Sequence, residues 1–275
     1  MAAVFLWFLR KIPKAFEKSC KSCNFKKQIP AILQHSSMDF KTLRELVRQG
    51  EGKQLEFKLK TNHPEKIVRE IVAFANSDGG KLLVGIGDDR SIKGLKYVDE
   101  DEYILTRAIE KYCSPEIEYT IERISVADER DVLIFDIPPS KDRPHYVLQE
   151  SDHKQISVVF SAPKKRSSLP PKPTNTLLKK AYIRIADKSV QASWEVREIL
   201  RRSREERNIH FRYGDKERKL MQHLDQHKSI TVEMFATTAN IPRKMASKTL
   251  VLLVLANVLR VHPNEMVDRF TMIGG

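Results

Sequence analysis

A near-continuous apolar run at residues 81–87 constrains the fold more than any other feature of the sequence. A strand of this kind is buried on both faces, because polar side chains do not alternate along it. It follows an amphipathic helix predicted over residues 64–76, which opens with proline and repeats its apolar residues at helical spacing. The sequence Asn-Ser-Asp-Gly-Gly at 76–80 ends that helix, since glycine adopts the positive φ of a helix end. The chain therefore needs a sheet that is covered on both sides.

The order of the remaining elements predicts the fold class. Asp39 is a suitable N-cap for a helix that ends near residue 49, and residues 53–60 alternate as a half-buried strand does. Further elements are expected as a helix at 99–113 and strands at 118–126, 132–137, 146–148 and 181–186. Helices and strands mixed in this way predict an α+β domain with a mixed sheet.

Composition and patterning divide the chain into four segments. Residues 1–37 form a basic leader that we expect to lie outside the fold, and residues 38–191 form the α+β domain. A charged connector helix is expected within 192–214, and 215–275 shows three short helices and a terminal hairpin, the pattern of a winged helix-turn-helix. Prolines and lysines at 160–180 predict an exposed basic loop.

The charge balance indicates the class of partner. Lysine and arginine number 49 against 36 acidic residues, a net charge of +13, which favours a polyanion such as nucleic acid or an anionic membrane. The leader's apolar run at 2–9 is far shorter than the ~20 residues of a membrane span. Three cysteines exclude a disulfide scaffold. We expect no stable membrane insertion and a cytoplasmic location, and no pattern in the sequence predicts an oligomeric state.

Several linked stretches resemble the Schlafen Alba-like domain. They are Gly-Glu-Gly-Lys-Gln-Leu-Glu-Phe-Lys at 50–58, Ala-Phe-Ala-Asn-Ser-Asp-Gly-Gly at 73–80, Leu-Val-Gly-Ile-Gly-Asp-Asp at 83–89, Ile-Lys-Gly-Leu at 92–95 and Ala-Tyr-Ile-Arg-Ile-Ala-Asp at 181–187. The resemblance covers about residues 38–191, and a C-terminal winged helix is a common companion of this domain. It implies an α+β fold that binds DNA or RNA and, in some members, a metal-dependent endoribonuclease that cleaves structured RNA.

The resemblance also implies a carboxylate triad. Nuclease members use two glutamates five residues apart and an aspartate after the glycine-rich strand, which places Glu51, Glu56 and Asp88 in these roles. Such carboxylates can hold Mg²⁺ or Mn²⁺, which neutralises a phosphodiester and activates water. A structural alternative stays open, in which Glu56 pairs with Lys58 on the same strand face and Asp88 belongs to a turn. The label "ATP-binding" that attaches to the family has no support here, because the chain has no Gly-x-x-x-x-Gly-Lys-Ser/Thr stretch.

Basic residues outside the triad are candidate phosphate contacts. Lys58 could reach a phosphate from its strand, and the second motif helix of a helix-turn-helix faces the groove of DNA with its N-terminal part. The other candidates are Lys164, Lys165, Arg166 and Lys172 in the basic loop, and Arg243, Lys244, Ser247 and Lys248 after Pro242. The competing interpretations are a solvated loop and a winged helix that binds protein.

The sequence favours a nucleic-acid-binding protein that regulates transcription through DNA. A divalent-metal endoribonuclease and an interaction module that binds no nucleic acid remain the alternatives, so whether the chain is an enzyme stays open.

Overall fold

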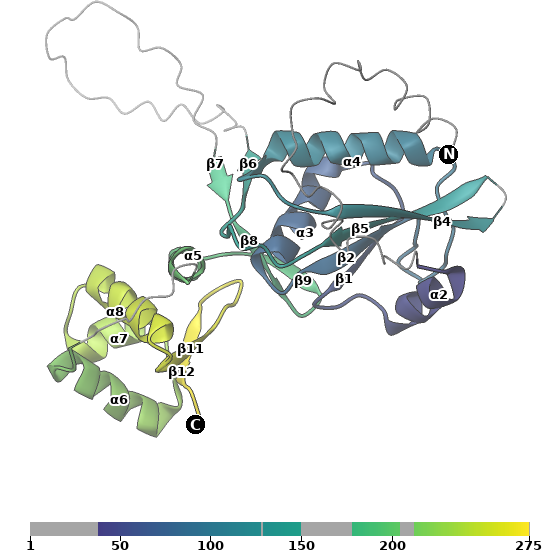
Figure 1. Cartoon of the computed structure of the whole chain (residues 1–275). Helices are drawn as coiled ribbons and strands as arrows, with labels where there is room; N and C mark the ends of the chain where they lie inside the picture. Colours follow the sequence, from purple (N-terminus) through teal and green to yellow (C-terminus); the bar gives the residue numbers. More distant parts are fainter. Residues whose placement is uncertain (1–37, 128, 150–177, 204–211, 275) are drawn as a thin grey trace, which may run out of the picture. The chain divides into compact units, whose positions relative to one another are not determined.

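A four-stranded mixed sheet forms the centre of the N-terminal part of the chain (Figure 1). The computed structural model describes residues 38–127, 129–149, 178–203 and 212–274. The strand order is β1-β2-β5-β4, with β1 at Leu55–Lys58, β2 at Gly80–Val84, β5 at Arg130–Ile137 and β4 at Thr120–Ala127. Strands β1 and β2 are parallel and are connected by the crossover helix α3 (Pro64–Asn76). The β2–β5 and β5–β4 pairings are antiparallel. The predicted α+β class with a mixed sheet is confirmed.

Strand β2 is buried on both faces, as its apolar sequence predicts. Leu82 packs into a core with α3 and α4 (Val98–Tyr112), whereas its neighbour Leu83 packs into a second core with α2 (Phe40–Gln49). Both leucine side chains have no exposed surface. Side chains of a strand point alternately to its two faces, so one apolar run supplies both cores.

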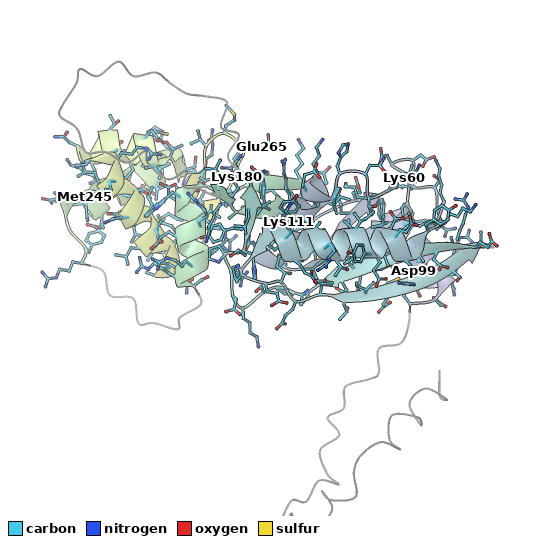
Figure 2. All side chains as sticks on the ribbon, turned by 90° about the horizontal axis from the view of Figure 1, so that it is seen from above. Lys60, Asp99, Lys111, Lys180, Met245 and Glu265 are labelled. Atoms are coloured by element: carbon cyan, nitrogen blue, oxygen red, sulfur yellow. The ribbon has the colours of Figure 1, made fainter. Side chains whose placement is uncertain are left out.

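The observed ends of two elements can be compared with the predicted ends. The strand predicted over 81–87 ends at Val84, because Gly85 has a φ of +104° and leads into a turn that approaches Gly94. Asp39 caps α2 as expected, and its carboxylate accepts a hydrogen bond from the backbone N–H of Thr42. Helix α4 carries Asp99 in its first turn and Lys111 in its last, which complements the helix dipole (Figure 2).

Two small sheets complete this part of the chain. Strands β3 (Cys113–Ser114), β6 (Tyr146–Gln149) and β7 (Leu178–Lys180) form one, and the hairpin of β8 (Tyr182–Ile185) and β9 (Lys188–Gln191) forms the other and lies against α3. The predicted loop over 160–180 is therefore wrong at its end, because β7 pairs with β6. The rest of that loop lies outside the described residues.

The C-terminal part is a bundle of short helices with a small sheet. Helices α6 (Asp215–His227), α7 (Val232–Ala239) and α8 (Arg243–Leu255) pack with the antiparallel sheet β10-β12-β11. Its strands are β10 at Ser229–Ile230, β12 at Arg269–Met272 and β11 at Leu259–His262. Phe235 and Phe270 are fully buried in its core. The hydroxyl of Thr231 caps α7 by accepting from the N–H of Met234.

A helix precedes this bundle. Within the range 192–214, where a charged connector helix is expected, the described residues form α5 (Trp194–Arg202), with Ser193 as its N-cap. The predicted leader, residues 1–37, also lies outside the described residues. Within the described ranges, every helix is too short or too polar to cross a bilayer.

Gly79 gives a direct test of the turn between α3 and β2. Its φ is +74°, and an added Cβ would lie 2.7 Å from the carbonyl oxygen of Ile137. We expect Gly79→Ala to lower the free energy of unfolding by about 2 kcal/mol or more, since left-handed backbone alone costs an alanine about 1–2 kcal/mol. Urea denaturation measures this.

Gly52→Ala is the matched control. A Cβ at Gly52 would meet nothing within 4 Å. Equal stability of the two variants would contradict the turn geometry described for Gly79.

Candidate functional site

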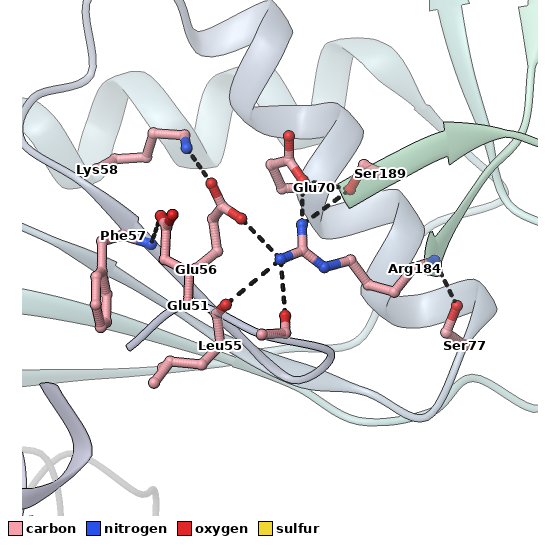
Figure 3. Close-up of polar contacts among 10 residues, drawn as sticks. Glu51, Leu55, Glu56, Phe57, Lys58, Glu70, Ser77, Arg184 and Ser189 are labelled. Carbon is pink, nitrogen blue, oxygen red and sulfur yellow. Dashed lines mark hydrogen bonds and ion pairs between the residues drawn. The ribbon is translucent and has the colours of Figure 1, made fainter. Parts of the chain in front are cut away.

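A buried arginine connects the elements around the glutamate motif (Figure 3). The side chain of Arg184, on β8, has no exposed surface. Its Nη2 lies 2.8 Å from Oε2 of Glu56, and its Nη1 lies 2.7 Å from Oε2 of Glu70. The same guanidinium donates to the backbone carbonyls of Gly52 and Leu55. Two carboxylates and two carbonyls thus compensate a charge that is removed from water.

Strand and helix geometry bring these residues together. Leu55 and Phe57 of β1 face the core under α2, so Glu56 and Lys58 point to the opposite face, towards α3 and β8. Helix α3 supplies Glu70, whose carboxylate accepts from the hydroxyl of Ser189 on β9. We name Glu56, Lys58, Glu70, Arg184 and Ser189 the arginine cluster.

The arginine cluster has a balanced charge. Two carboxylates face the guanidinium of Arg184 and the ammonium of Lys58, which contacts Glu56. Burial raises the pKa of the Glu70 carboxyl, and the nearby charge of Glu56 acts in the same direction. The hydrogen bond from Ser189 and the charge of Arg184 oppose this shift. Lys58, a predicted phosphate contact, is half-buried and forms an ion pair with Glu56. This pairing is the structural alternative that the sequence left open for Glu56.

The structure does not bring the predicted triad into one metal site. Glu51 uses its carboxylate to accept the backbone N–H of Phe57 at 3.0 Å, and Glu56 faces Arg184. Asp88 is exposed in the turn that Arg90 closes by donating to the carbonyl of Gly87. Among the residues that the structure describes, no three His, Cys, Asp or Glu side chains are grouped so that they could hold a metal ion. Glu51, Glu56 and Asp88 thus do not fit Mg²⁺ or Mn²⁺, which prefer several converging oxygen ligands.

The predicted contacts on α8 divide into three kinds. Lys244 and Lys248 are exposed and have no ion pair or hydrogen bond within the described ranges. Arg243 is exposed too, but its Nε lies 2.7 Å from the carboxylate of Glu233 on α7. Ser247 is buried, and its hydroxyl donates to the carboxylate of Glu195 on α5, so the prediction that it contacts nucleic acid is wrong for this arrangement. Lys244 and Lys248 are four residues apart and share one exposed face of α8.

An open groove lies along the exposed face of α8. It has a volume of about 460 Å³, and its lining includes Pro242, Met245 and Leu252 with the three lysines Lys216, Lys244 and Lys248. Met245 is 45% exposed and projects from the C-terminal bundle (Figure 2). Among the described residues, no acidic side chain lines this space, which we name the α8 groove. A larger pocket of about 600 Å³ beside Gly79 is lined instead by opposed charges, with Lys53 paired to Asp78 and Lys81 paired to Asp136.

The remaining predicted phosphate contacts belong to the basic loop. Lys164, Lys165, Arg166 and Lys172 lie outside the described residues. Arg184 and Glu70, in contrast, were not among the predicted site residues. Arg184 stands in one of the stretches that carry the family resemblance, which was the available signal.

The family profile described as Schlafen, AlbA_2 matches residues 51–193, just over half of the chain. The chain belongs to the Schlafen AlbA_2 family. Both motif glutamates and the whole arginine cluster lie inside the matched range. In this member of the family, Glu51 and Glu56 hold β1 in place through the backbone of Phe57 and through Arg184. Membership in the Schlafen AlbA_2 family suggests nucleic-acid binding.

Two solved structures are similar to the chain. The N-terminal domain of a RecG-related protein from Nitrosomonas europaea has 19% identity and a TM-score of 0.32, covering 46% of this chain and 90% of that one. The DIP2311 protein from Corynebacterium diphtheriae has 14% identity and a TM-score of 0.35, covering 64% of this chain and 29% of that one. These scores are too low to support any further argument. No curated protein matches the chain.

The arginine cluster predicts that Glu56 matters for stability. Glu56→Ala leaves the buried guanidinium of Arg184 with one carboxylate instead of two, and we expect a loss of about 3 kcal/mol in the free energy of unfolding. Denaturation in urea with circular dichroism measures the change.

Asp88→Ala is the control from the same predicted triad. Asp88 is exposed, so its substitution should leave the unfolding midpoint where it is. A Glu56→Ala protein as stable as the unsubstituted chain would show that Arg184 does not depend on this carboxylate.

Proposed function

We propose that the chain is a nucleic-acid-binding protein whose C-terminal part binds duplex DNA through the α8 groove. The finer part of the proposal is regulation of transcription. A protein that occupies DNA can regulate transcription by excluding or recruiting other proteins.

The C-terminal part has the elements of a winged helix-turn-helix. Three helices, α6 to α8, are followed in the chain by the β11–β12 hairpin. Strand β10, which comes between α6 and α7 in the sequence, pairs with β12. We propose that residues 215–275 form such a domain. Its second motif helix would be α8, whose N-terminal part enters the major groove in DNA-binding members of this class.

The observation that carries the proposal is the charge of the α8 groove. Three lysines surround it, and two of them, Lys244 and Lys248, keep their ammonium groups exposed and unpaired within the described part of the chain. Phosphate contacts of this kind position a protein on DNA, and the release of counterions supplies much of the affinity. Met245 lines the same groove and can contact the methyl group of thymine.

The nuclease alternative has no comparable support. A metal-dependent phosphodiesterase needs carboxylates that converge on a cation. Here Glu56 forms ion pairs with Arg184 and Lys58, and Glu51 accepts a hydrogen bond from the backbone of β1. An interaction module that binds no nucleic acid remains the outcome if the following experiment fails.

A salt series on duplex DNA tests the proposal. Fluorescence anisotropy at several salt concentrations should give an affinity that falls as salt rises. Lys244→Ala with Lys248→Ala should weaken binding, and the slope of log K against log salt should decrease by about one for each lysine removed.

Lys41→Ala with Lys219→Ala is the charge-matched control. Both lysines are exposed and lie outside the α8 groove. Equal losses in the two double variants would mean that net charge, and not the α8 groove, determines binding. Affinity that does not change with salt would overturn the proposal altogether.

A further inference from the structure

Two histidines on helix α6 face one another. His223 and His227 lie one helical turn apart, and their ring centroids are 4.5 Å apart with the planes inclined by 39°. Residues at positions i and i+4 of a helix share one face. A single ion can therefore lie within about 2.0–2.1 Å of a nitrogen from each ring after small side-chain rotations.

The Nε2 atom of His223 is unsatisfied. It is buried and has no hydrogen-bond partner among the described residues. Buried polar atoms in proteins are paired in the large majority of cases, so an unpaired one needs an explanation, and a bound ion is one of those known. This second observation is independent of the ring geometry.

Charges and burial around the two histidines act on cation binding in both directions. Burial lowers the pKa of His223, and the adjacent His227 acts in the same direction, so both favour the neutral ring that a metal ion requires. His227 is the last residue of α6, where the carbonyl end of the helix dipole favours positive charge. The lysine content of α6 acts in the opposite direction, with Lys219 one turn before His223.

We propose that His223 and His227 form a binding site for a late first-row transition-metal ion such as Zn²⁺, Ni²⁺ or Cu²⁺. Imidazole prefers these ions over Mg²⁺ and Ca²⁺. No third His, Cys, Asp or Glu joins the pair within the described ranges, so water or an external ligand completes the coordination. The site does not depend on nucleic-acid binding, since neither histidine lines the α8 groove.

Calorimetric titration of the full chain with Ni²⁺, at pH 7 and without chelating buffers, tests the proposal. The unsubstituted chain should bind one equivalent, and His227→Ala should bind Ni²⁺ more weakly. His227 is exposed, so this substitution should leave the fold intact. The affinity should fall at least about tenfold, because one of the two imidazole ligands is gone.

His262→Ala is the matched control, since His262 is exposed in the same C-terminal part and its ring contacts the hydroxyl of Thr271. This variant should bind Ni²⁺ as the unsubstituted chain does. The electron paramagnetic resonance spectrum of added Cu²⁺ should show two nitrogen ligands in the unsubstituted chain and fewer in His223→Ala. No uptake by the unsubstituted chain, or equal uptake in His227→Ala and the unsubstituted chain, would overturn the proposal.

Discussion

The buried charge of Arg184 is the constraint on which the N-terminal part depends. A guanidinium without exposed surface is tolerated only where carboxylates and carbonyls surround it. Glu56 of β1, Glu70 of α3 and the backbone of Gly52 meet this requirement. The guanidinium also lies over the ring of Phe74, and the backbone N–H of Arg184 donates to the hydroxyl of Ser77. One residue of the β8–β9 hairpin thus joins the edge strand, the crossover helix and the turn that follows it.

This arrangement separates the family motif from the chemistry that the motif suggests. Glutamates five residues apart are compatible with metal catalysis, but the same spacing also suits a structural task in a strand. Glu51 precedes β1 and holds the N–H of Phe57, while Glu56 lies within β1 and faces Arg184. The balanced charge of the arginine cluster leaves no surplus of negative charge for a divalent cation. The proposed binding of nucleic acid does not depend on this motif, because the proposed contacts are the exposed lysines Lys244 and Lys248 of α8.

The sequence predicted the parts of the fold that depend on local patterns. The apolar run at 81–87 indicated a strand covered on both faces, and Asp39 was identified as a helix cap. Contacts between segments that are distant in the chain could not be predicted from local patterns. Arg184 and Glu56 are far apart in the chain, and nothing local shows that they meet. Ser247 illustrates the same limit, because its burial depends on Glu195 of a different helix. His223 and His227 are four residues apart in the sequence, but only the bounds of α6 and the ring positions bring out their pairing.

Our central proposal is that this Schlafen AlbA_2 protein binds nucleic acid, and the structural roles of Glu51 and Glu56 predict that the nucleic acid stays intact. End-labelled tRNA and duplex DNA, each incubated with saturating protein and Mn²⁺ and then resolved on a denaturing gel, test it most directly, with a parallel native gel to record binding. The account predicts a shifted complex from which full-length nucleic acid is recovered. Fragments that form with the unsubstituted chain and disappear with the surface variant Asp88→Ala would contradict it.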